Sequence, residues 1–163
     1  MKKILSLLCI FLALSTLSAF AIPNDEKPQD SKEVKDFSDI HRTYIQAWSD
    51  WDVDTIVKYG DGAAGYGHST AFPRPVREEN SFRAGVKKFY EGMEAFKIRL
   101  VTENYRVIGT TGVAWGHYAC TTKQKDGPRR TIYLRYAHTF AKRDGKWMLV
   151  LYHRSLLTAE DMQ

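Results

Sequence analysis

The chain has 163 residues and a formal net charge of +5, from 24 lysines and arginines against 19 aspartates and glutamates. This length suits one domain of ordinary size, and a second domain is not expected. The basic residues are spread along the chain rather than gathered in one run, which argues against nucleic acid as a partner.

Residues 1–21 have the pattern of an export signal. Lys2 and Lys3 precede an unbroken apolar run that finishes on Ala19, Phe20 and Ala21, a small-x-small sequence that a signal peptidase accepts. The apolar run is shorter than the roughly 20 residues needed to span a bilayer, so a retained membrane anchor is the weaker alternative. We therefore expect cleavage of this signal peptide and a periplasmic or secreted protein without stable membrane insertion.

Removal of this leader changes the charge and the cysteine content of the remaining chain. Loss of its two lysines lowers the net charge to +3, and loss of Cys9 leaves Cys120 with no partner for an internal disulfide. Residues 22–35 hold two prolines, many charges and almost nothing apolar, which predicts a flexible linker. A single folded domain is expected over residues 36–163.

Three helices are predicted after this linker. The first carries apolar residues at steps of three and four, which form one stripe on about four helical turns. These residues are Phe37, Ile40, Tyr44, Ala47, Trp48 and Trp51. Asp52 suits the N-cap of a second, shorter helix that Gly60 can end. The third helix is expected between Glu78 and Met93, with Phe82, Val86, Phe89 and Met93 on one face.

The second half of the chain is predicted to form strands. Residues 60–75 are rich in glycine and proline and exclude a long regular element, although residues 63–69 could form a short edge strand. After Phe96 the composition changes to β-branched and aromatic residues, which predicts four strands. They cover residues 96–109, 113–123, 130–142 and 146–157, with Asp-Gly turns at 125–128 and 143–146. Three helices followed by consecutive antiparallel strands predict an α+β fold.

Residues 135–155, RYAHTFAKRDGKWMLVLYHRS, resemble the last hairpin of the nuclear transport factor two-like superfamily. The likeness is to its SnoaL-like members and to the association domain of calcium/calmodulin-dependent protein kinase type two. Residues 82–92 and 107–118 are weaker matches. The resemblance implies a cone-shaped domain, in which three helices pack on a curved antiparallel sheet around a pocket, and a homodimer or higher homo-oligomer formed through the open sheet. It implies no particular reaction, since this scaffold carries isomerases, dehydratases, hydrolases, hubs and pure binders.

The register of the last hairpin decides which residues reach the expected pocket. A plain two-residue Asp-Gly turn would place His138 on one face with Leu151 and His153. A turn with a glycine bulge would shift the register by one. His138 would then share a face with Tyr136, Val150, Tyr152 and Arg154. The kinase association domain has arginines at the positions of His138 and Arg154, lining its pocket, and this resemblance favours the bulged register.

The candidate ligand-binding residues are basic or phenolic, namely Tyr66, Arg135, His138, Tyr152 and Arg154. A strand arginine among aromatic residues either extends to solvent or pairs with a bound anion. A strand histidine either lines a pocket or is satisfied by a neighbouring polar group. We expect no cofactor, and no metal site, because the strand histidines lack the HxH or HxxxH spacing of metal ligands.

An isomerase on this scaffold needs a carboxylate directed into the cone. The acids between residues 98 and 155 are Glu103, Asp126 and Asp144. Two of these lie in turns, so the sheet contributes almost no carboxylate. Asp61 stands where the isomerase branch has its base, with His68 and Tyr66 beside it. In an isomerase, Asp61 or His68 would be the base, and Tyr44 or Tyr66 would polarise a carbonyl. Plain turn chemistry is the alternative for Asp61.

Three functions remain open on these grounds. The first, which we favour, is an exported, non-enzymatic binding or assembly module whose pocket takes a small anionic molecule. The second is a small-molecule isomerase or lyase of the ketosteroid isomerase or SnoaL type. The third is a periplasmic partner-binding protein, such as an immunity or inhibitor protein, that acts through the surface of its sheet.

Overall fold

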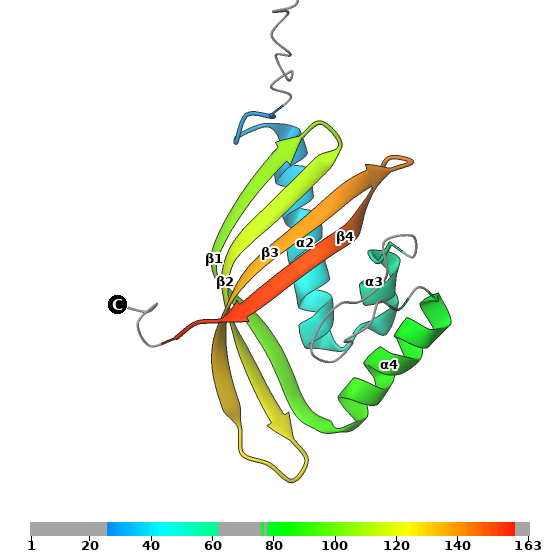
Figure 1. Cartoon of the computed structure of the whole chain (residues 1–163), viewed down its shortest axis with the longest axis vertical. Helices are drawn as coiled ribbons and strands as arrows, with labels where there is room; N and C mark the ends of the chain where they lie inside the picture. Colours follow the sequence, from blue (N-terminus) through cyan, green and yellow to red (C-terminus); the bar gives the residue numbers. More distant parts are fainter. Residues whose placement is uncertain (1–25, 62–75, 77, 159–163) are drawn as a thin grey trace, which may run out of the picture.

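The computed structural model describes residues 26–61, 76 and 78–158. Three helices precede four strands along the chain (Figure 1). The helices are α2 (Lys32–Asp50), α3 (Val53–Lys58) and α4 (Glu79–Glu91), and the strands are β1 (Met93–Ile108), β2 (Thr111–Gln124), β3 (Arg130–Arg143) and β4 (Lys146–Leu156). The strands form one sheet in the order β1-β2-β3-β4, and all neighbours are antiparallel. The predicted α+β fold is confirmed.

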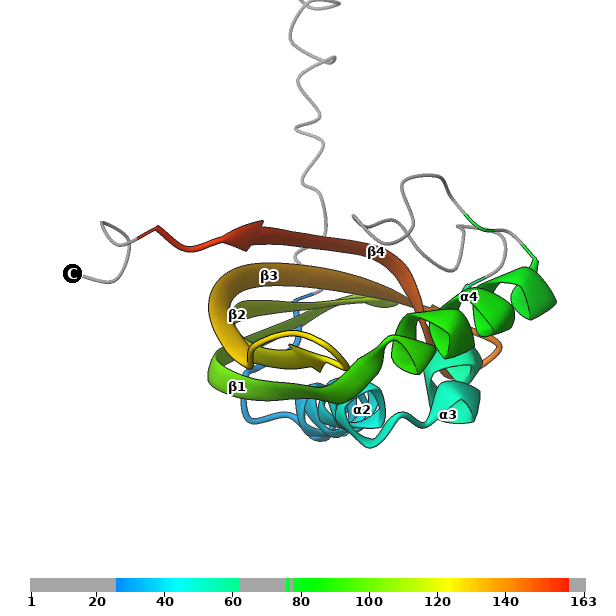
Figure 2. The same ribbon diagram turned by 90° about the horizontal axis from the view of Figure 1, so that it is seen from below.

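The sheet is curved and unclosed, with the helices packed against it. In Figure 2 the strands follow an arc from β1 to β4, with α2 next to β1 and with α3 and α4 towards one end of the arc. The Ser49 hydroxyl of α2 accepts a hydrogen bond from the Ile98 amide at 2.9 Å and donates to the Ile98 carbonyl at 3.2 Å. Because Ile98 lies on the edge strand β1, α2 satisfies backbone groups that would otherwise be open to another strand.

Helix α2 begins earlier than the sequence pattern predicts. Ser31 is its N-cap, and the Ser31 hydroxyl accepts a hydrogen bond from the Val34 amide at 3.3 Å. The helix therefore starts at Lys32, four residues before the expected start of the folded domain at Asp36. Glu26 also forms an isolated bridge with Ile108, so part of the region predicted as a linker is held against the sheet. Serine is a strong capping residue, and its effect outweighs the polar composition that follows it.

The second and third helices follow the prediction closely, with one boundary moved. Asp52 caps α3, as predicted, by accepting a hydrogen bond from the Thr55 amide at 3.0 Å. Helix α4 ends at Glu91, and Met93 begins β1 instead of completing the last helical turn. The prediction extended the third helix too far because Met93 follows Phe89 by four residues, which is the spacing of a helix face, although it belongs to the strand.

A tight turn and a bulge define the last hairpin. Asp144 and Gly145 have φ values of 48° and 76°, which matches a two-residue type I′ turn. Five residues further on, the register shifts, because Val150 is an extra residue in β4. The shift pairs His138 with Tyr152. The predicted bulged register, which places His138 on one face with Tyr152 and Arg154, is therefore confirmed. The bulge lies within β4, however, and not at the turn.

A second register shift lies between β1 and β2, where Thr102 of β1 pairs with His117, the residue after Gly116. The register shifts here between Leu100 and Thr102. A Cβ atom on Gly116 would lie 2.1 Å from the Thr102 carbonyl oxygen, so only glycine permits this approach. On the outer face, the Thr102 hydroxyl accepts a hydrogen bond from the His117 amide at 3.0 Å and lies 3.0 Å from His117 Nδ1.

The core lies between the inner face of the sheet and the helices, and aromatic rings dominate it. Phe37 of α2 and Phe140 of β3 are both fully buried, and their ring centroids are 5.5 Å apart. Phe37 also packs directly on Gly112, where a side chain would collide with its ring. Among the residues described, no helix is long and apolar enough to cross a membrane.

Candidate functional site

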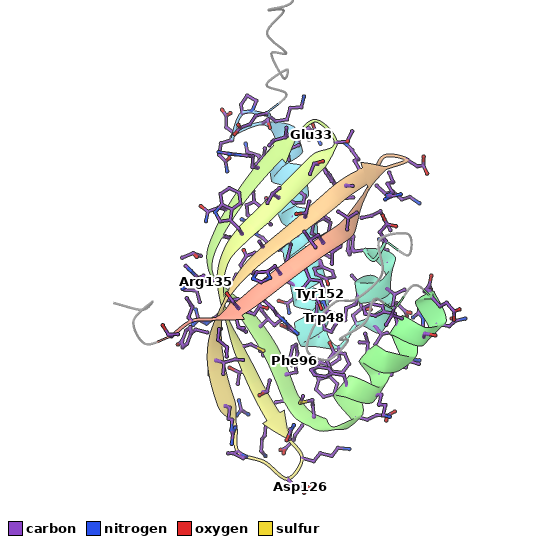
Figure 3. The ribbon with its side chains drawn as sticks, viewed as in Figure 1. Glu33, Trp48, Phe96, Asp126, Arg135 and Tyr152 are labelled. Atoms are coloured by element: carbon purple, nitrogen blue, oxygen red, sulfur yellow. The ribbon has the colours of Figure 1, made fainter. Side chains whose placement is uncertain are left out.

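The inner face of β3 and β4 carries the polar residues that the sequence singled out. His138 pairs with Tyr152, and Tyr136 pairs with Arg154, so these four side chains share one face of the hairpin. His138 is only 4% exposed, and its ring centroid lies 6.1 Å from that of Tyr152. Tyr152 and Trp48 are labelled in Figure 3 on the side of the sheet where the helices lie.

Arg154 is half-buried among phenolic side chains. Its guanidinium carbon lies 5.9 Å from the centre of the Tyr152 ring. Burial lowers the pKa of Arg154, but the neighbouring groups, with Tyr118 first among them, more than offset this effect, so the guanidinium stays charged. Among the described residues, no carboxylate forms an ion pair with Arg154. This part of the inner face therefore carries a positive charge whose neighbours are neutral hydroxyl groups.

A second histidine, His41 of α2, contacts His138 across the core. His41 Nε2 lies 3.0 Å from His138 Nδ1, and His41 is completely buried. Burial lowers the pKa of His41 to about 4 and also holds the pKa of His138 well below its usual value. Both rings are therefore neutral at neutral pH.

The histidine pair continues as a chain of hydrogen bonds towards the surface. His41 Nδ1 lies 3.2 Å from the Tyr105 hydroxyl, which donates to the Glu103 carboxylate at 2.6 Å. Arg42 donates to both oxygens of Glu103, at 2.9 to 3.2 Å. The bond from Arg42 lowers the pKa of Glu103, so this carboxylate is ionised at neutral pH. We call the sequence His138, His41, Tyr105, Glu103 the inner chain.

Sequence reasoning missed His41 as a site residue, although one signal was present. Position 41 is four residues after Phe37 and three before Tyr44, so it lies on the apolar stripe of α2. A polar side chain in such a position is buried and must find a hydrogen-bond partner. Glu103 was recognised as an acid on a strand, but nothing in the sequence connected it to a histidine.

The other predicted residues are distributed over both faces of the sheet. Tyr44 is buried, and its ring lies 6.2 Å from that of His138, so it joins the same inner cluster. Burial raises the pKa of its hydroxyl. Arg135 is exposed and lies between the buried Leu134 and Tyr136 of β3, so it is on the outer face, opposite to that of Tyr136 and Arg154. The two candidate arginines are therefore separated by the thickness of the sheet.

Asp61 lies apart from the inner chain in its contacts. It follows Gly60, which forms a parallel bridge with Leu149 of β4. Its buried carboxylate lies 2.7 Å from the Nε atom of Arg143, at the end of the last hairpin. This ion pair joins the end of α3 to the sheet. Tyr66 and His68, the other residues predicted near Asp61, lie outside the described residues.

A separate groove of about 990 Å³ lies between α2 and the first three strands. Four of the side chains that line it are basic, namely Arg42, Lys97, Arg99 and Arg129. His138, Tyr152 and Arg154 do not line this groove. In the part of the chain that the structure describes, no three His, Cys, Asp or Glu side chains gather as metal ligands would.

Comparison with solved structures shows the same architecture in several bacterial proteins. A proposed dehydratase of the NTF2-like family from Streptomyces avermitilis is 13% identical, and the match covers 78% of this chain and 97% of that one at a TM-score of 0.61. A proposed calcium/calmodulin-dependent protein kinase II association domain from Xanthomonas campestris is 21% identical, with 81% and 92% covered and a TM-score of 0.58. An LEH-like epoxide hydrolase from M. tuberculosis is 13% identical, with 80% and 88% covered and a TM-score of 0.55.

At these identities the similarity concerns the fold alone. No curated protein matches the chain in sequence. The sequence profile of the SnoaL-like domain, by contrast, matches residues 38–159, which is most of the chain and includes α3, α4, all four strands and most of α2. This chain therefore belongs to the SnoaL-like domain family, and it has the fold of the NTF2-like structures.

Proposed function

We propose that the chain is an exported, non-enzymatic module that binds a small anionic molecule on the inner face of β3 and β4, beside Arg154 and His138. The observation that carries this proposal is the charge of Arg154, which is half-buried among phenols and forms no ion pair with a carboxylate of the described residues. A partly desolvated guanidinium gains more from a bound carboxylate or phosphate than an exposed one does.

The family supports a role that involves a small molecule. The SnoaL-like fold with neighbours named as a proposed dehydratase and an epoxide hydrolase fits a small-molecule-binding or isomerase-type module. The described inner face lacks the ionised carboxylate that an acid-base enzyme of this scaffold would direct at its substrate, since Glu103 is held by Arg42 at the far end of the inner chain. We therefore favour binding over turnover.

The decisive experiment compares the two candidate arginines by calorimetric titration of the full chain with phenylacetate, a small aromatic anion. We expect the Arg154→Met variant to bind at least tenfold more weakly, because a charge-assisted hydrogen bond contributes about 1.5 to 3 kcal/mol. Arg135→Met is the matched control, on the outer face of the same hairpin, and should bind like the unsubstituted chain. Equal binding by the Arg154→Met variant, or a loss confined to Arg135→Met, would overturn the proposal.

A small-molecule isomerase or lyase is the second candidate, and the neutral, buried His138 beside Tyr44 favours it. A neutral imidazole can accept a proton, and a phenol can polarise a carbonyl. In this candidate we assign the base to His138, because the carboxylate of Asp61 is paired with Arg143. Turnover of an enolisable ketone should then be lost in His138→Gln and retained in Asp61→Asn. The reverse result would assign the base to Asp61.

We also propose that the outer face of the sheet binds a second copy of the chain. Trp115 of β2 and Leu151 of β4 are 38% and 62% exposed on this face, and their partners in the intervening strand β3, Ala137 and Thr139, are two residues apart. An apolar patch on an open sheet favours association. Leu151→Lys should convert a dimer to a monomer in light scattering of the purified chain. A monomeric unsubstituted chain, or a different protein that co-purifies on this face, would contradict the homodimer.

A further inference from the structure

The hydrogen bonds of the inner chain all have their donors on the same side, and Glu103 sets this direction. We propose that Glu103 forces His138 to present an unprotonated Nε2 atom at the inner face, and that the site therefore takes a small hydroxy acid. The carboxylate of this ligand would bind Arg154, and its hydroxyl would donate a hydrogen bond to His138. The choice of ligand class rests on the proposed function, whereas the direction of the inner chain can be tested without any ligand.

The argument begins at the surface end of the inner chain. Arg42 can only donate hydrogen bonds, and the ionised carboxylate of Glu103 can only accept them. Tyr105 has one hydroxyl hydrogen, and the 2.6 Å distance to Glu103 places that hydrogen in a charge-assisted bond to the carboxylate. Towards His41, the Tyr105 oxygen is therefore left as an acceptor.

The same reasoning passes through both imidazole rings. His41 Nδ1, 3.2 Å from the Tyr105 oxygen, must carry a hydrogen in order to donate to it. A neutral imidazole carries only one N–H, so His41 Nε2 is an acceptor. His138 Nδ1, 3.0 Å away, must then be the donor. Since His138 is also neutral, its one hydrogen is used in this bond and its Nε2 atom carries only a lone pair.

The neutrality of both rings follows from their surroundings. The groups that face the pair are Arg42 and Tyr44 of α2, Glu103 and Tyr105 of β1, Tyr136 of β3, and Tyr152 and Arg154 of β4. Burial acts against a charge on either ring, and the two arginines add to this effect. Glu103 alone acts in the other direction, on His41, and it does not outweigh burial.

The free nitrogen lies within reach of the proposed anion site. His138 Nε2 has no hydrogen-bond partner among the described residues. His138 pairs with Tyr152 and Arg154 pairs with Tyr136, so His138 and Arg154 are diagonal neighbours on one face of the hairpin. Diagonal neighbours lie about 7 to 8 Å apart in a sheet. A molecule with a carboxylate and a hydroxyl a few bonds apart can contact both, and the tyrosine rings around them suit an aromatic substituent.

The direction of the chain can be measured by NMR on the full chain labelled with ¹⁵N in its histidine rings. Long-range ¹H–¹⁵N correlations distinguish a ring protonated at Nδ1 from one protonated at Nε2, and single histidine substitutions assign the signals. We expect both His41 and His138 to be protonated at Nδ1 at neutral pH. A His138 ring protonated at Nε2, or at both nitrogens, would overturn the inference.

The Glu103→Gln variant provides the sharper test because it should reverse the direction. Arg42 can only donate, so it will attract the amide oxygen of the new side chain and turn the amide NH2 group towards Tyr105. Tyr105 would then donate to His41, and each later bond would reverse, which moves the hydrogen of His138 to Nε2. Asp39→Asn is the matched control, since Asp39 contacts Arg42 at 3.2 Å but lies outside the inner chain. An unchanged His138 ring in Glu103→Gln would contradict the role of Glu103.

The ligand class is tested with mandelate and phenylacetate, which differ by one hydroxyl group. We expect the unsubstituted chain to bind mandelate about tenfold more tightly, as one added hydrogen bond allows. Equal affinity in the unsubstituted chain would overturn the hydroxy acid while leaving anion binding intact. Failure of both acids to bind would contradict the proposed function and this ligand class together, and the NMR result would then decide the direction of the chain by itself.

Discussion

Two histidine hydrogen bonds of the same length lie on opposite faces of the sheet. On the inner face His41 and His138 are 3.0 Å apart and both buried, whereas on the outer face His117 and the Thr102 hydroxyl are 3.0 Å apart near water. Loss of a partner on the inner face leaves a buried polar group without a hydrogen bond, whereas on the outer face water takes the place of the lost partner. Bond length alone therefore says little about the contribution of either bond to stability.

The largest effect is expected when the inner pair is broken. His41→Ala removes a fully buried ring and leaves both the His138 ring and the Tyr105 hydroxyl without this partner. The combined cavity and the lost hydrogen bonds should lower the free energy of unfolding by about 4 kcal/mol. Urea denaturation followed by tryptophan fluorescence measures this loss. A decrease of less than about 1 kcal/mol would show that the inner pair is not a structural element.

Acid should break the same pair without a mutation. The pKa of His41 falls from 6.5 in the unfolded chain to about 4 in the folded one, so the unfolded chain binds the proton more strongly. The stability that His41 contributes is complete above pH 6.5 and is lost as the pH falls through about 4, which amounts to about 3 kcal/mol. Urea midpoints measured between these pH values should decline, and the decline should be smaller in His41→Gln, where the buried His138 still contributes its own part. A flat profile in the unsubstituted chain would refute this assignment.

Next to the outer hydrogen bond of His117, the buried Gly116, and not the histidine, should prove essential. Gly116→Ala places a methyl group where the Thr102 carbonyl oxygen lies, only 2.1 Å away, so one strand must move. Such overpacking should cost about 2 to 3 kcal/mol of unfolding free energy. The melting temperature from circular dichroism reports the change, and a variant as stable as the unsubstituted chain would show that the two strands separate easily at this point.

The smallest effect is expected for His117→Ala. The substitution removes the side-chain contact with Thr102, but the backbone amide of residue 117 still donates to the same hydroxyl at 3.0 Å. We expect a loss of about 0.5 kcal/mol, within the range of a solvent-accessible hydrogen bond. The same urea titration compares it directly with His41→Ala. Equal losses in the two variants would remove the distinction between the faces.

Local sequence patterns predicted most of the fold because they reflect nearest neighbours along the chain. The spacing of Phe82 and Val86 predicted a helix face, and Asp52 predicted the start of a helix, and both are present. The errors fall at boundaries such as Met93, which begins β1 although its spacing continues α4. A residue at such a junction satisfies both patterns, and packing selects between them.

The candidate site was only half predictable from the sequence. His138, Tyr152 and Arg154 were selected and share the inner face of the sheet, with Tyr44 of α2 packed near His138, whereas Arg135 lies on the outer face. The bulge at Val150 decides this arrangement, since it brings Tyr152 and Arg154 to the face of His138. A two-residue turn without this bulge would have placed Tyr152 and Arg154 on the face opposite to His138.

Chain order and periodicity were enough to determine three amphipathic helices, four strands and an α+β domain, because each depends on side chains a few residues apart. The tertiary structure decided that His41 and His138, which are 97 residues apart, meet in the core and that Glu103 sits at the end of their hydrogen bonds. A hydrogen-bond partner across the core has no periodicity in the sequence, since only the folded curvature of the sheet and the placement of α2 bring such groups within 3.0 Å.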